Sequence, residues 1–70
     1  MENWRKRAKD AGLSQRQIAK LCGIHENTVS RQLSGEWEVP RYVISVIVAW
    51  ELMTHEQRME WIETIGPQQP

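Results

Sequence analysis

The chain has 70 residues, which suits one small domain. At this size a core buries only about 60% of the surface of the unfolded chain, so small domains commonly rely on a disulfide, a metal or a partner subunit. Cys22 is the only cysteine, which excludes an intrachain disulfide and fits a reducing compartment. The N-terminus is charged, and the longest apolar stretch, 43–50, is too short to cross a bilayer. We therefore expect a cytoplasmic protein with no signal peptide, no membrane contact and a partner subunit.

Charge is distributed unevenly along the chain. The net formal charge is zero, but residues 1–35 carry seven Lys and Arg against three acidic residues, a net +4. Residues 36–70 carry two Arg against six Glu, a net charge of −4. The basic half is suited to phosphate and the acidic half is not, so the asymmetry favours a nucleic-acid partner. An unevenly charged surface without a partner is the alternative.

Helix-forming residues predominate, and five helices are predicted. The first covers about residues 2–11, with Trp4, Ala8 and Ala11 on one face, and ends at Gly12. The second starts after Ser14, which forms a capping box with Gln17. Its apolar side is formed by Ile18, Ala19, Leu21 and Cys22.

The third helix is short, with one apolar edge. Gly23 ends the helix before it, and the third helix begins near His25 or Glu26 and ends before Gly35. Val29 and Leu33, four residues apart, form its inner edge, and its other faces are polar.

The fourth helix is predicted from Pro40 to Met53, with proline in the first turn. It is apolar nearly all round, and such helices are normally buried on all sides. A strand over Val43–Val48 is the competing assignment, because β-branched residues predominate there. A monomer of this length has little with which to cover the helix, so we expect a dimer interface formed by Tyr42, Val43, Val46, Ile47, Trp50 and Met53.

The fifth helix starts after Thr54, which forms a second capping box with Gln57. Its apolar stripe consists of Met59, Ile62 and Ile65, with Trp61 beside it. Gly66 and Pro67 end the helix, and residues 67–70 have the composition of a flexible tail.

Two short helices joined by a tight turn make residues 13–35, LSQRQIAKLCGIHENTVSRQLSG, a candidate helix-turn-helix. Ala19 is small where the two helices would cross, and Gly23, four residues later, suits a left-handed turn. The segment resembles the Cro/lambda-repressor-like (XRE) family through Leu13-Ser14-Gln15, Ile18-Ala19, Leu21, Gly23-Ile24, Thr28-Val29-Ser30-Arg31 and Gly35. Gln32 departs from the family, which usually has an apolar residue there, and Leu33 is expected to replace its packing.

This resemblance implies an all-α, five-helix lambda-repressor-like DNA-binding domain over residues 1–66. Residues 1–35 would be the DNA-binding half and residues 40–66 the dimerisation helices. The third helix would enter the major groove and read bases through its exposed residues, namely Glu26, Asn27, Ser30 and Arg31. Arg31 matches the guanine acceptors and Asn27 suits adenine, whereas Glu26 would accept from cytosine or orient Arg31.

Phosphate contacts are expected from Gln15, Arg16, Thr28, Gln32, Arg41 and His25. The alternatives are a solvated Arg31 or Arg41, and an Asn27 and Glu26 that are merely polar first-turn residues. Trp37 either packs on its loop or touches the DNA backbone. Cys22 and His25 have a spacing that suggests metal, but a zinc site needs four ligands, so no metal and no cofactor are expected.

The segments Val39-Pro40-Arg41-Tyr42-Val43 and Ala49-Trp50-Glu51 are similar to small phage-encoded autoregulators, including those associated with anti-CRISPR genes. The expected function is a repressor that binds, as a homodimer, an inverted-repeat operator of its own operon in a bacterial cell, without a small-molecule effector. The rival functions are an antitoxin that binds DNA and a toxin, and a protein-interaction adaptor. An enzyme is not expected, because no catalytic constellation is visible.

Overall fold

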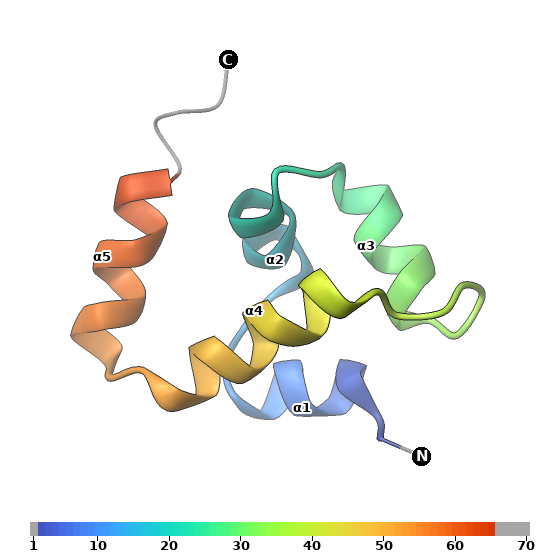
Figure 1. Ribbon diagram of the computed structural model, residues 1–70, viewed down its shortest axis with the longest axis horizontal. Helices are drawn as coiled ribbons and strands as arrows, with labels where there is room; N and C mark the ends of the chain where they lie inside the picture. Colours follow the sequence, from blue (N-terminus) through green and yellow to red (C-terminus); the bar gives the residue numbers. More distant parts are fainter. Residues whose placement is uncertain (1, 66–70) are drawn as a thin grey trace.

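A computed structural model describes residues 2–65 of the chain. Figure 1 shows the helices, which are α1 (Trp4–Asp10), α2 (Gln15–Cys22), α3 (Glu26–Leu33), α4 (Arg41–Leu52) and α5 (His55–Ile65). Residues 2–65 contain no strand. The all-α, five-helix prediction is confirmed, and the strand assignment for Val43–Val48 is excluded.

The capping residues set the helix boundaries. α1 begins two residues later than predicted, because the side chain of Asn3 accepts the amide of Lys6 at 3.0 Å and so caps the helix. Pro40 is the residue before α4 rather than part of its first turn, and its carbonyl accepts the amides of Val43 and Ile44. The predicted stop at Gly66 and Pro67, and the tail over 67–70, lie outside the described residues.

Both predicted capping boxes are present. At α2 the Ser14 hydroxyl accepts the Gln17 amide at 3.1 Å, and the Gln17 side chain accepts the Ser14 amide at 3.0 Å. At α5 Thr54 and Gln57 make the same pair of bonds, at 3.2 and 2.8 Å. Each box satisfies two amides that a helix start would leave without partners.

One core joins the first four helices. Its buried apolar residues are Ala8, Leu13, Ile18, Ala19, Val29, Leu33, Val43, Ile47 and Trp50. α2 packs against α3, α4 and α5, and α1 packs against α4. α5 has no buried residue and covers the core with half-buried side chains, which include Met59, Trp61 and Ile62.

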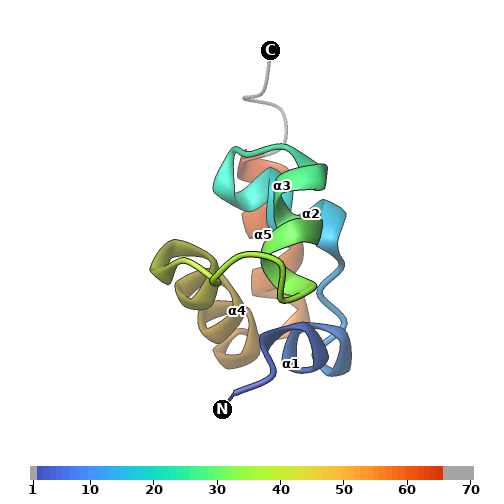
Figure 2. The same cartoon turned by 90° about the vertical axis from the view of Figure 1, so that its right-hand side faces the viewer.

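α3 and α5 lie far apart in the molecule. In Figure 1, α3 lies at the right and α5 at the left, and α4 crosses between them above α1. Turned by 90°, α3 faces the viewer and α5 lies behind it (Figure 2). α3 and α5 are therefore on opposite sides of the core. No helix within residues 2–65 has both the length and the apolar character needed to cross a membrane.

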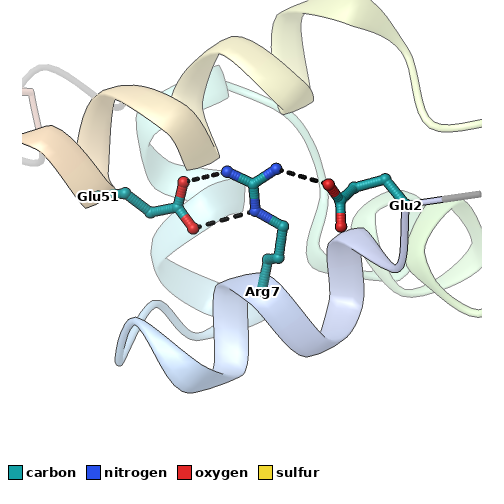
Figure 3. A network of polar contacts seen from close by, with 3 residues as sticks. All are labelled: Glu2, Arg7 and Glu51. Atoms are coloured by element: carbon teal, nitrogen blue, oxygen red, sulfur yellow. Dashed lines mark hydrogen bonds and ion pairs between the residues drawn. The ribbon is translucent and has the colours of Figure 1, made fainter.

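Arg7 joins α1 to α4. Its Nε and Nη2 donate to the two carboxylate oxygens of Glu51 at 3.1 and 2.5 Å, and its Nη1 donates to Glu2 at 3.0 Å (Figure 3). The hydrogen bonds from Arg7 lower the pKa of Glu51 below its ordinary value. Because Arg7 and Glu51 are 44 positions apart in sequence, this paired contact fixes a long-range helix packing.

A second polar contact holds α5. The Ala11 carbonyl, just after α1, accepts the indole N–H of Trp50 at 2.8 Å. Arg58 of α5 donates to that same carbonyl at 3.4 Å and to the Trp50 carbonyl at 2.8 Å. Its guanidinium also lies 5.0 Å from the centroid of the Trp50 ring. α1, α4 and α5 thus meet around one backbone oxygen and one indole.

Half of the predicted dimer interface is wrong. Val43 and Ile47 have no exposed surface and Trp50 has 2%. Their spacing places them on one side of α4, and that side packs against the core of the same chain. Tyr42 is exposed, and Val46 and Met53 are half-buried, so only these three of the six remain accessible to another subunit.

Candidate nucleic-acid interface

A tight turn sets the angle between α2 and α3. Gly23 has φ +70° and ψ +33°, a left-handed conformation that glycine adopts with little strain. The amides of Gly23 and Ile24 both donate to the Ala19 carbonyl, which ends α2. Ala19 is 6% exposed and lies in the core.

His25 begins α3. Its Nδ1 accepts the Asn27 amide at 3.1 Å, so the imidazole has the capping role that serine or threonine usually has. The His25 side chain is exposed, so the start of α3 is open to another molecule.

The packing of α3 exposes one polar face. Val29, Gln32 and Leu33 are buried and fix the inner side of the helix. The four predicted base-reading residues are all exposed, and their spacing of one, three and one positions puts them on one face. They are Glu26, Asn27, Ser30 and Arg31.

Arg31 lies against the loop that follows α3. Its guanidinium carbon is 5.4 Å from the centroid of the Trp37 ring, within the range of a cation–π contact. The Trp37 amide and the Ser34 hydroxyl both donate to the Arg31 carbonyl, at 3.2 and 3.1 Å. Trp37, whose role the sequence left open, therefore packs on Arg31 while it keeps 46% of its surface exposed.

The start of α2 lies beside α3 with free donors. The capping box uses the amides of Ser14 and Gln17, whereas those of Gln15 and Arg16 have no partner among residues 2–65. Arg16 is exposed and Gln15 half-buried. Free amides and a cation at a helix N-terminus are suited to a phosphate oxygen.

The other predicted phosphate contacts differ in exposure. Arg41, the first residue of α4, is exposed, as is His25, and Thr28 is half-buried. The prediction for Gln32 is wrong, because this side chain is only 5% exposed and its Nε2 donates to the Tyr42 hydroxyl at 3.2 Å. A side chain enclosed between α3 and α4 cannot reach a phosphate.

The candidate metal ligands are not grouped. Within residues 2–65 no three His, Cys, Asp or Glu side chains lie close enough to hold an ion. Burial raises the pKa of the Cys22 thiol, which keeps it protonated and makes it a packing residue.

Residues 5–35 match the model of a family described as a homeodomain-like domain. The match covers α1 from its second residue, α2, the turn and α3, and amounts to less than half of the chain. The comparisons with curated proteins and with solved structures give no match. The fold and the matched segment together define a helical domain with a helix-turn-helix, a class that typically binds DNA.

Proposed function

We propose that this chain is a sequence-specific DNA-binding transcription regulator whose α3 reads bases in the major groove. The observation that carries the proposal is the outer face of α3. Four side chains able to bond to base edges are exposed together there, beside the free amides of α2. Arg31 is the principal reader, because its planar fork fits the O6 and N7 acceptors of guanine.

Regulation is proposed to occur through a homodimer. A two-fold dimer would place two copies of α3 about 34 Å apart, one turn of DNA, on an inverted repeat. The accessible side of α4 supports a self-interface, since Leu52 is 81% exposed, Tyr42 is 47% exposed and Val46 is half-buried. An apolar side chain as exposed as Leu52 gains from being covered.

The proposed role is repression by occupancy. The dimer would cover a promoter, in the first instance that of its own operon, in the manner of the small phage autoregulators of the Cro/lambda-repressor-like family that the sequence resembles. Such a protein would act on DNA in the bacterial cytoplasm without a small-molecule effector.

The first experiment is a mobility-shift titration on the DNA upstream of the coding sequence, with random DNA as competitor. Saturable binding that survives the competitor, at a site with inverted half-sites, is the expected result. Binding that is lost to the competitor at moderate salt would reduce the function to unspecific attraction to phosphate. A reporter gene that is activated rather than repressed would contradict the repressor role.

The dimer has its own test in sedimentation equilibrium. Leu52→Glu is expected to shift the chain toward the monomer, because it places a charge on the most exposed apolar side chain of α4. Ser30→Glu, which adds the same charge on the exposed face of α3 rather than on α4, is the control for the oligomeric state. A wild-type chain that stays monomeric, but co-purifies with one other protein in a defined ratio, would favour the antitoxin alternative.

A further inference from the structure

The cations of α1 divide into two pairs. Lys6 forms an ion pair with Asp10 at 2.9 Å, and Arg7 is held by Glu2 and Glu51. Arg5 and Lys9 are both exposed, and among residues 2–65 neither has a carboxylate partner. Half of the positive charge of α1 is therefore neutralised within the chain, and half is available to another molecule.

The two available cations lie on one groove. Arg5 and Lys9 are four residues apart, so they are neighbours on the helix surface. They line a groove of about 410 Å³ together with Ser14 and Gln15 at the start of α2. Leu33, the last residue of α3, lines the same groove. The groove therefore continues the surface on which α2 and α3 are proposed to meet DNA.

The positions of Arg5 and Lys9 favour a bound anion. Like charges at this spacing on a helix surface repel each other. An anion between them would remove that repulsion. Of the side chains that line this groove, none is acidic. Arg5 also borders a second groove, which contains Glu2, Glu36 and Glu38, so the side that favours a phosphate is the one shared with Lys9.

We propose that Arg5 and Lys9 each contact a backbone phosphate next to the site that α3 reads, so that the DNA footprint includes α1. This inference rests on the proposed function, since it names two more contacts of the same interface. These contacts would fix register and add affinity without reading sequence.

The test is the salt dependence of binding. Each phosphate contact contributes about 0.9 to the slope of log K against log salt concentration. Arg5→Gln and Lys9→Gln are each expected to lower that slope by about 0.9 on the operator and on random duplex DNA alike. The preference for the operator over random DNA is expected to stay unchanged.

Lys6→Gln is the matched control. It removes the same charge from the same helix, but from a side chain that Asp10 already neutralises, so its slope is expected to stay near that of the unmodified chain. Equal slope changes in all three variants, or none in Arg5→Gln and Lys9→Gln, would overturn the inference. Circular dichroism checks that the variants fold, as expected for exposed side chains. If the unmodified chain binds no DNA, the proposed function itself fails, whereas binding with unaltered slopes contradicts only the contacts of α1.

Discussion

α3 and α5 lie on opposite sides of the core and are held there in different ways. α3 has eight residues, three of them buried, and the turn at Gly23 and the loop contact with Trp37 fix its two ends. α5 has eleven residues and none of them buried. It is held by half-buried side chains and by the polar bonds of Arg58.

The difference in packing between α3 and α5 corresponds to two different requirements on a helix. A helix that reads bases must be placed closely, because hydrogen bonds to base edges tolerate little displacement. A helix that packs against another subunit can leave part of its burial to the assembled state. The firmly packed α3 fits the first requirement, and the lightly packed α5 fits the second.

The largest expected effect compares the two helices directly. Leu33→Ala in α3 removes a side chain that is only 7% exposed and should lower the free energy of unfolding by about 2–5 kcal/mol. Ile62→Ala in α5 removes a half-buried side chain and should cost about 1 kcal/mol. Urea unfolding of both variants at low protein concentration measures the difference. A loss for Ile62→Ala as large as that for Leu33→Ala would mean that α5 is covered in solution.

A second change tests how closely α3 is placed. Ala19→Leu adds volume in the core on the α2 side of the helix-turn-helix and should destabilise the fold by about 1–3 kcal/mol. Ala49→Leu, at a half-buried position of α4, is the control and should change the unfolding midpoint little. An Ala19→Leu chain with the wild-type midpoint would contradict a tight crossing.

The proposed base reading by α3 would depend most on Arg31. Arg31→Ala should weaken specific binding by about 1–3 kcal/mol and relax the preference at one base pair. Arg31→Lys keeps the charge but loses the planar fork, so it should relax the preference while restoring unspecific affinity. Titration of operators altered at single positions measures both. Equal weakening on every sequence would make Arg31 a phosphate contact.

The smallest expected effect concerns the ion pair between Arg7 of α1 and Glu51 of α4. Arg7 lowers the pKa of Glu51, so the stability that Glu51 contributes is present above the ordinary glutamate pKa, about 4.3, and is lost as the pH falls through the lowered value. Glu51→Gln should therefore lower stability modestly at pH 7 and by less at pH 3, because the contribution of the charged form shrinks as the pH falls below the ordinary glutamate pKa. Urea unfolding at the two values checks this, with Glu56→Gln, exposed on α5, as control. A deficit that persists undiminished in acid would assign the effect to packing.

The sequence predicted the helices through local rules. The two capping boxes, the glycine at the turn and the spacing of Val29 and Leu33 each act within a few residues, so they can be recognised without a structure. The exposed face of α3 follows from that spacing. Gln32 could have been placed correctly by the same rule, because it is three residues after Val29 and next to Leu33.

Which side of α4 is buried could not be predicted from such local rules. A helix that is apolar nearly all round has no polar face to show which stripe is buried, and the choice depends on what α1 and α2 present to it. Trp50 lies inward because the Ala11 carbonyl, 39 positions away, accepts its indole N–H. The free cations of α1 were missed for a similar reason, since the partner of Arg7 is 44 positions distant.

The contact between Arg31 and Trp37 adds a cost to the proposed base recognition, because the guanidinium must leave the indole ring. In the free chain the guanidinium already has a partner, so a base that takes it must offer more than the indole ring does. Guanine, with two acceptors, meets that condition more readily than a single hydrogen bond from another base. Under the proposed function, release of the indole ring is a cost common to every base that Arg31 would bind, and Trp37→Leu would be expected to raise the affinity for DNA.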